Sequence, residues 1–571
     1  MLSLTAVKSY FSKQISNPFF YAVCAALLFL PFLGHVHLFD WDEINFAEIS
    51  REMLVLDNYL QVHVRFLPFW EKPPLFFWLQ ACCMQLFGVN EFAARLTNAL
   101  CGIITLPVLF CIGKKLYDEK FGFFWALIYA GTLLPTLYFQ TGIIDPIFNL
   151  FMFLGIYFFI LFTWKKKNET NIELVHSALY YLFFAGLFTG LAMLTKGPAA
   201  FIILGLCYFV YWVIVKFKWY ISVPQFLFYT LIAFSLSAIW YGIETLMHGS
   251  YFITKFFEYN FRLFSTEEAG HAGFPGYHFV VVFLGCFPAS LFLFKGLFKQ
   301  EHAFSYRKNF KTWMLILFWS VLLLFSLVNT KIVHYSSMTY FPLTFIAALT
   351  LYEMYKQKTV LRKDIFWSIR ILSIVIGVAL IALPIIGLNI EWLQNKTQDV
   401  FAKANMNAEV SWTGIESIIG VLFIISAFVG TALMRNGNIM KGSVILFIST
   451  AIVFKLAMIV YVPNIEKYSQ GAAIEFYESI SDEDVYLQPI GFKTYAPLFY
   501  AKLLPQNAPK VSDYSDKKQV AEWEKWLLNG AIDKPAYFIT RIDKKNTLES
   551  NPKLNLLMNK NGFLVYKRMP E

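Results

Sequence analysis

Residues 40–78 carry an unusual number of charged side chains for a stretch that lies between two apolar segments. They include Asp42 with Glu43, and Glu71 with Lys72. A charged side chain at the centre of a bilayer costs roughly 2.5–3.5 kcal/mol, so these residues must lie at an interface or in a wet cavity. A carboxylate in such a place can accept a proton from an attacking hydroxyl, and a lysine can hold an anion. This stretch is where we expect chemistry.

Asp145 is a second candidate acid, because it stands between two apolar runs. It precedes Pro146 in the segment GIIDPIF. Aspartate before proline often only starts a turn or a helix, and that alternative stays open. Asp42 has a similar alternative as a helix cap. Glu71 and Lys72 have one as a simple ion pair.

The local pattern of the first stretch predicts two short helices. After an aspartate cap at 40 or 42, Phe46 and Ile49 fall on one face and Glu48 and Arg51 on the other. This pattern predicts a helix lying along the membrane surface. Two prolines then follow Lys72, and proline suits the first turn of a helix, so residues 73–88 form the second predicted helix.

The composition is that of an integral membrane protein. The 571 residues are 57% hydrophobic and 15% charged, against about 25% charged in soluble domains. The net charge of +10 does not indicate nucleic-acid binding, because the cations gather in short loops between apolar runs. The seven cysteines lie in or beside apolar segments without metal-ligand spacing. The first apolar run has no cleavage site after it and is expected to be a retained span.

Apolar runs of spanning length recur along the chain and predict about thirteen transmembrane helices. With a cytoplasmic N-terminus, most loop lysines fall on the cytoplasmic side, and the acids at 40–72 and Asp145 face outward. The predicted spans are 19–36, 91–113, 121–139, 143–164, 176–194, 198–215, 222–246, 275–298, 312–329, 335–355, 365–389, 412–434 and 442–462.

The last hundred residues change character. They are charged and contain the strand-like runs VYLQPI, AYFIT and GFLVYKR, with a helical AEWEKWLLNG between them. A segment of this length can form its own core, so residues 464–571 are expected to be a small α/β domain on the outer face, after a membrane domain at 1–463.

Several motifs together resemble one known family. The runs DEINFAEISREML, WEKPPLFFWL, FGVNEFAARLTNAL, TGIIDPIFNLF, LTKGPAA and NTKIVHYSSMTYFP are similar to those of polyprenyl-phosphate-sugar-dependent glycosyltransferases of the GT-C fold. The lipid A 4-amino-4-deoxy-L-arabinose transferases are the nearest in pattern, within the dolichyl-phosphate-mannose protein mannosyltransferase superfamily. The resemblance implies an all-α polytopic membrane protein with juxtamembrane helices, a small C-terminal α/β domain, and an active site in loops 37–90 and 247–274.

The resemblance also implies roles for particular residues. It assigns catalysis to Asp42, Asp145 and Glu43; the carrier phosphate to Lys72, Arg262, Lys331 and Tyr335; and a divalent metal, zinc or magnesium, to Glu71 and His271. Two of these residues have alternatives without a functional role: Lys331 can extend from a helix end to the membrane interface, and His271 can be exposed to solvent.

The expected activity is transfer of a sugar from an undecaprenyl-phosphate carrier, with inversion, at the periplasmic face of a bacterial inner membrane. The expected acceptor is a hydroxyl or phosphate of lipid A or another envelope glycolipid. A protein or glycan acceptor is the first alternative, and only an assay separates it. A lipid or sugar transporter is the second, but the sequence shows neither the repeated halves nor the charges deep within spans that it predicts. A non-catalytic scaffold would not need Asp42, Asp145, Glu71 and Lys72 together.

Overall fold

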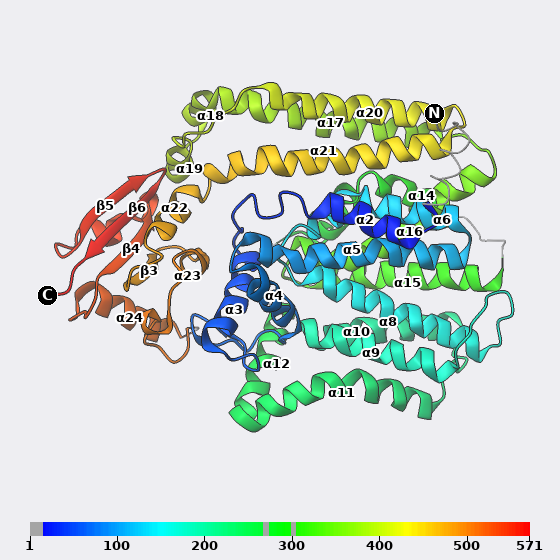
Figure 1. The fold of residues 1–571 in the computed structure, drawn as a ribbon, viewed down its shortest axis with the longest axis horizontal. Helices are drawn as coiled ribbons and strands as arrows, with labels where there is room; N and C mark the ends of the chain where they lie inside the picture. Colours follow the sequence, from blue (N-terminus) through cyan, green and yellow to red (C-terminus); the bar gives the residue numbers. More distant parts are fainter. Residues whose placement is uncertain (1–14, 266–272, 299–303, 515) are drawn as a thin grey trace.

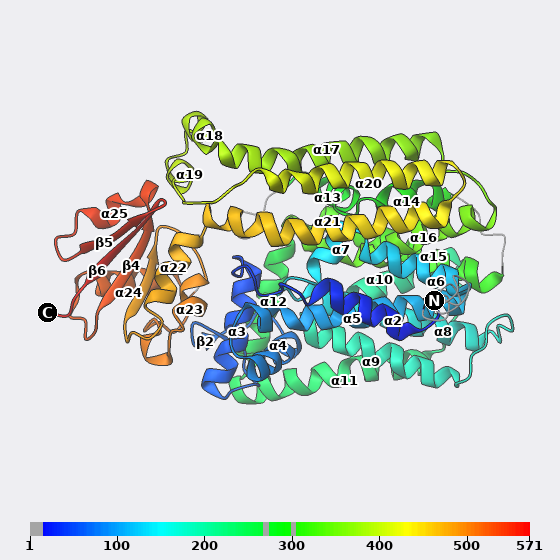
Figure 2. The same ribbon diagram turned by 45° about the horizontal axis from the view of Figure 1, so that its top comes forward.

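The computed structural model describes residues 15–265, 273–298, 304–514 and 516–571. Helices dominate the chain up to Lys467, and a small sheet follows near the C-terminus (Figure 1). In both views the sheet lies beyond one end of the helical bundle, and the first described residues lie at the other end (Figure 2).

Among the described residues, eight helical segments are long and apolar enough to cross a membrane, so the chain is a multi-pass membrane protein. They are α5 (Glu91–Leu116), α8 (Asp145–Lys166), α9 (Ala178–Lys196), α11 (Val223–His248), α15 (Ser305–Leu327), α17 (Lys363–Leu388), Ile415–Arg435 with α20 (Ile418–Arg435), and α21 (Ile439–Lys467). Shorter helices complete the bundle: α2 (Pro18–Phe29), α6 (Glu119–Ala130), α7 (Leu133–Tyr138), α10 (Ala199–Ile214), α13 (Tyr277–Gly285), α14 (Ala289–Phe298) and α16 (Tyr340–Lys356).

Each predicted span coincides with a helix or a pair of helices, but the count of thirteen stays a prediction. The predicted span 121–139 is divided into α6 and α7, and 275–298 into α13 and α14. Pro288 lies between the last two, directly before the first residue of α14. An apolar run read from sequence therefore need not be one straight helix.

Two juxtamembrane helices, α3 (Asp42–Leu56) and α4 (Leu75–Phe87), form where the sequence predicts them. The predicted aspartate cap of α3 is wrong, because Trp41 holds the cap position without a side-chain bond. The polar face of α3 is buried, whereas its orientation along the membrane surface stays a prediction. Arg51 donates to both carboxylate oxygens of Glu48 at 2.7 Å and to the carbonyl of Leu503 at 2.8 Å. The C-terminal domain covers this face. The periodicity of the local sequence could not predict this contact, because the partner is remote in the chain.

The strands of the C-terminal domain confirm the predicted α/β character. The sheet has the order β3-β4-β6-β5, with β3 parallel to β4 and the other pairs antiparallel. Its elements are α22 (Gly471–Ser479), β3 (Tyr486–Ile490), α23 (Ala496–Tyr500), α24 (Lys517–Asn529), β4 (Ala536–Arg541), α25 (Asn546–Glu549), β5 (Asn555–Lys560) and β6 (Phe563–Arg568). The predicted domain boundary at 463/464 falls inside α21, four residues before its last residue.

An apolar contact attaches this domain to the bundle. Leu38, Ile44 and Ala47 share one buried cluster with Ile474 and Phe476 of α22. The backbone N–H of Leu38 also donates to the hydroxyl of Tyr500 at 2.6 Å. The domain is therefore packed directly over the start of α3, where the first candidate acid lies.

Candidate functional site

A cavity of about 1730 Å³ lies between the bundle and the C-terminal domain. Its bundle side is lined by the start of α3, the segment before α4, the start of α8, the end of α9, α12 (Ser250–Ser265) and the 3-10 helix η1 (Val333–Thr339). Its other side is lined by 488–495 and 512–524 of the C-terminal domain. Segments far apart in the sequence thus meet around one space large enough for a substrate.

Asp42 and Asp145 both approach the same ring nitrogen of one histidine in this cavity. His334 Nε2 is 3.4 Å from Asp42 Oδ2 and 3.6 Å from Asp145 Oδ2. Burial lowers the pKa of His334, although the two carboxylates act in the opposite direction. Each acid is the first residue of its helix, α3 or α8, where the helix dipole favours a negative charge.

The two acids differ in access. Asp145 is buried and accepts a 2.6 Å hydrogen bond from Lys196 Nζ. The side chain of Asp42 is 30% exposed, and its one ion-pair contact within 4 Å among the described residues is His334. Asp42 is therefore open to an incoming hydroxyl, whereas Lys196 and His334 surround Asp145.

The predicted phosphate ligands are only partly brought together. Lys72, Arg262 and Tyr335 line the cavity together with Glu71. Burial lowers the pKa of Lys72, and the charges of Glu71, Asp42 and Asp145 oppose that shift. Tyr335 also packs against Lys196, whose Nζ lies 5.2 Å from the ring centroid.

The structure does not place Lys331 on this wall. Its Nζ donates to the backbone carbonyls of Ser326 at 2.7 Å and Phe325 at 3.2 Å, and also to that of Val328. A lysine at this position satisfies carbonyls that the end of α15 leaves without intrahelical partners. The geometry thus favours a structural role for Lys331.

Glu43 lies at the cavity wall with both carboxylate oxygens occupied. Arg95 Nε donates to Oε1 at 2.8 Å and Nη2 to Oε2 at 2.9 Å. The backbone N–H groups of Phe39 and Gly142 also donate to it, at 2.9 and 2.7 Å. Burial raises the pKa of Glu43, but Arg95 and these hydrogen bonds outweigh that effect and lower it. Glu43 therefore joins α3 to α5 and to the segment that carries Asp145.

Arg65 is a cavity residue that the sequence analysis missed. It lies in the turn between β1 (His63–Val64) and β2 (Leu67–Pro68), with a φ of 60° followed by 58° at Phe66. Its guanidinium is 3.5 Å from the ring centroid of Tyr514, and its buried Nε has no hydrogen-bond partner among the described residues. Burial lowers the pKa of Arg65 to about 10. A left-handed pair without glycine gives no recognisable turn signal in the sequence.

Lys196 and His334 were also missed as site residues, although both stand in motifs that carry the resemblance. A lysine after an apolar run, as Lys196 is in LTKGPAA, can equally be a helix-end residue or a ligand, and His334 in NTKIVHYSS has no separate signal. Only the folded chain shows that both contact Asp145.

The predicted metal pair cannot be assembled from the described residues. Glu71 lines the cavity, and His271 lies in 266–272, outside the described residues. Within the described ranges, one group of three side chains is close enough to hold a metal ion: His37, Glu91 and Glu478. None of these three residues lines the cavity.

The fold is that of a polytopic GT-C-type membrane protein. Over 96% of this chain and 97% of the other, the structure matches ArnT from Cupriavidus metallidurans, solved bound to undecaprenyl phosphate, with a TM-score of 0.75 and 16% identity. This match confirms the predicted fold class.

The sequence comparisons agree with the resemblance. Residues 71–241 match the family model described as dolichyl-phosphate-mannose-protein mannosyltransferase. The undecaprenyl phosphate-alpha-4-amino-4-deoxy-L-arabinose arabinosyl transferase of Wigglesworthia glossinidia brevipalpis is 25% identical over 331 residues. Transferase 1 of the same name from Proteus mirabilis is 26% identical over 323 residues. In each case the match covers 56% of this chain and 56% of the relative, so the chain spans about half the length of these relatives.

Proposed function

We propose that this protein is a membrane glycosyltransferase that moves a sugar from an undecaprenyl-phosphate carrier to lipid A or another envelope glycolipid. The observation that carries the proposal is the pair Asp42 and Asp145 around His334, in one cavity with Lys72 and Lys196. A carboxylate open to solvent beside cations is what sugar transfer from a lipid phosphate requires. The named activities of the similar arabinosyl transferases support the same assignment.

The geometry gives each group a step. Lys72, Arg262 and Tyr335 bind the carrier phosphate on the bundle side of the cavity. An acceptor oxygen attacks the anomeric carbon, and the bond from that carbon to the phosphate oxygen breaks. The electron pair leaves with undecaprenyl phosphate, and the configuration inverts. Where the acceptor is a hydroxyl, Asp42 takes its proton, a contribution of roughly 10²–10⁴-fold.

The residues around Asp145 position the site. Lys196 fixes Asp145 at 2.6 Å, and His334 joins Asp145 to Asp42. Arg65, which packs against Tyr514 of the C-terminal domain, presents a charged group in the same cavity to an anionic part of the acceptor, such as a phosphate.

We further propose that the cavity and the C-terminal domain face the periplasm from a bacterial inner membrane. The lysines at the ends of α5 and α8, at 114–115 and 165–166, lie in the last turns of helices that begin at or near the cavity end. Such positive loops favour the cytoplasmic side, and this supports a periplasmic cavity. A membrane domain at 1–463, an outer domain at 464–571, and a divalent metal at Glu71 and His271 stay predictions.

A protein acceptor is the second candidate, because the matching family model is described as a protein mannosyltransferase. The same active-site chemistry would serve a protein hydroxyl. Acceptor analysis in cells separates the two candidates.

The test is mass spectrometry of lipid A and of periplasmic glycoproteins from cells with the gene deleted, then complemented. Loss of one sugar from lipid A, restored by wild type and not by Asp42→Asn, is the expected result. Loss of a sugar from a glycoprotein alone would support the second candidate. No change in any glycoconjugate would contradict transferase activity.

A further inference from the structure

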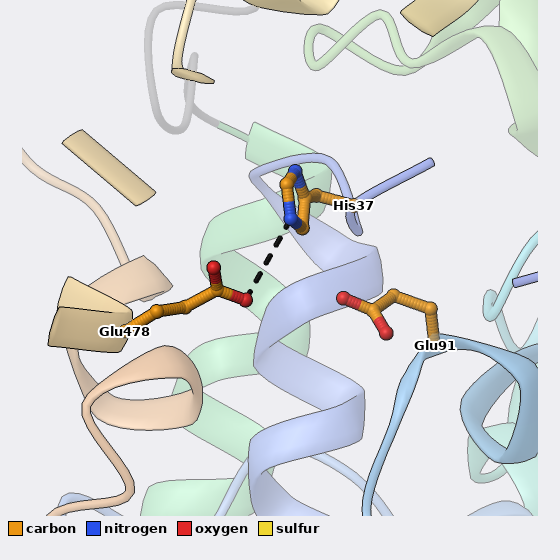
Figure 3. Close-up of side chains that lie close together, drawn as sticks. All are labelled: His37, Glu91 and Glu478. Atoms are coloured by element: carbon orange, nitrogen blue, oxygen red, sulfur yellow. Dashed lines mark ion pairs between the residues drawn. The ribbon is translucent and has the colours of Figure 1, made fainter. Parts of the chain in front are cut away.

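A group of metal-ligating side chains lies at the edge of the contact between the C-terminal domain and the bundle. His37 precedes α3, Glu91 is in the first turn of α5, and Glu478 is in α22 (Figure 3). One ligand atom from each lies within 4.8 Å of the other two. None of the three lines the cavity described above. We propose that these residues bind a divalent transition-metal ion, which joins the C-terminal domain to the membrane bundle.

The orientation of His37 is the first argument. Its Nδ1 lies 3.1 Å from Oε1 of Glu466, a buried carboxylate near the end of α21. The other ring nitrogen, Nε2, faces Glu478 Oε1 at 3.7 Å. Metal-binding histidines almost always donate their second ring N–H to a carboxylate, a backbone carbonyl or water, which fixes the tautomer and the ring. Glu466 is placed to do this and leaves the lone pair of Nε2 for the ion.

The charge balance is the second argument. Three carboxylates, those of Glu91, Glu466 and Glu478, surround one imidazole. Among the described residues, His37 is the cationic partner within 4 Å of Glu466 and Glu478. A doubly charged ion at Nε2 would offset this excess of negative charge.

A proton on His37 is the competing occupant. Burial lowers the pKa of His37, but the hydrogen bond to Glu466 and the charges of Glu466, Glu91 and Glu478 outweigh it and raise the pKa. Because metal and proton compete for Nε2, metal binding should strengthen as the pH rises.

The donor set determines the type of ion. One imidazole nitrogen with two carboxylate oxygens suits zinc and, more weakly, manganese. Bonds of about 2.1 Å in a tetrahedral site place ligand atoms about 3.4 Å apart, so ligand atoms that lie within 4.8 Å of one another need to close by about 1.4 Å at most. The Glu478 side chain is 50% exposed and has room to move. Water would take the fourth position.

The bridge would have a mechanical consequence. His37 lies five residues before Asp42, and Glu478 belongs to the domain that covers the cavity. An ion held by both would fix the domain over the start of α3. Zinc should therefore raise the unfolding temperature of the full chain.

The test is zinc binding by the full-length protein in lipid nanodiscs, after the purification tag is cleaved and metals are stripped with a chelator. A chromophoric competitor then measures affinity, and elemental analysis measures stoichiometry. We expect one zinc per chain that His37→Ala and Glu478→Gln abolish, and that Glu466→Gln weakens by roughly 10–100-fold. Manganese and calcium, as separate probes, should bind more weakly than zinc.

Two variants serve as controls. His35→Ala removes an exposed histidine two residues away, whose ring contacts Phe32, and should leave zinc binding unchanged. Glu71→Gln should also leave this zinc in place, which separates the site from the cavity. Because Glu478 is half exposed, its glutamine variant should fold, and zinc should no longer raise its unfolding temperature. Absence of zinc from the wild type, or equal zinc in His37→Ala, Glu91→Gln and Glu478→Gln, would overturn the proposal.

Discussion

Two adjacent acids, Asp42 and Glu43, should respond oppositely to removal of their charge. Glu43 makes two hydrogen bonds to Arg95 and accepts two more from backbone N–H groups, with about 7% of its side chain exposed. Asp42 is 30% exposed and contacts His334 at 3.4 Å. Each acid changed to its amide keeps nearly the same shape and loses only charge.

The expected magnitude follows from burial. Glu43→Gln leaves the guanidinium of Arg95 buried without its counter-charge, and breaking a buried pair costs roughly 3–5 kcal/mol. Arg95 keeps the carbonyls of Leu33, Val36 and His37 as acceptors, so the lower half of that range is expected. Asp42→Asn should change the stability by roughly 1 kcal/mol or less, as for an exposed pair.

The assay is thermal unfolding of both variants in the same detergent, with sugar transfer measured in parallel. Glu43→Gln should unfold several degrees below wild type, and its correctly folded fraction should retain transfer. Asp42→Asn should unfold at about the same temperature as wild type, and its rate of transfer should fall by roughly 10²-fold or more. A Glu43→Gln protein with wild-type stability and no transfer would refute the structural role given to Glu43.

Three further predictions concern the cavity and α3. Lys196→Met removes the lysine that donates to buried Asp145 and leaves the contact with His334, so transfer should fall by roughly 10²-fold or more. Lys196→Arg should recover part of the activity, and wild-type activity in Lys196→Met would contradict the positioning role. Arg65→Gln should raise the acceptor KM by roughly 10-fold or more with little change in kcat, measured by varying acceptor at saturating donor; an unchanged KM would remove Arg65 from acceptor binding. Burial and neighbouring Glu48 raise the pKa of Glu52, so the stability contributed by protonated Glu52 is present at low pH and lost as the pH rises through that raised pKa. The unfolding temperature of Glu52→Gln should therefore fall less than that of wild type between pH 5 and pH 8, and parallel curves would show that Glu52 is ionised when folded.

The sequence is informative where structure depends on neighbours in the chain. The strands at 486–490, 536–541 and 563–568 contain aromatic and β-branched residues, which favour strands. The helices α3 and α4 begin at acids and prolines that favour helix starts. These features were predicted because they are local.

The remaining features depend on contacts between remote segments. The polar face of α3 could contact either solvent or another domain, and in the structure it contacts Leu503 of the C-terminal domain. The periodicity of the sequence is the same in both cases and could not distinguish them. Lys196 and Lys331 both follow apolar helices and have the same local signal, yet one binds Asp145 and the other binds carbonyls at the end of α15. Only the folded chain separates such residues.

The most direct test of the proposed activity is a transfer assay with purified protein and membranes from cells that lack the gene. Those membranes supply the native donor and the unmodified acceptor together. Wild type should add the mass of one sugar to an envelope glycolipid and release an equal amount of undecaprenyl phosphate, while folded Asp42→Asn and Asp145→Asn should not. Transfer by the two variants at the wild-type level, or no mass change with wild type, would contradict the proposed activity.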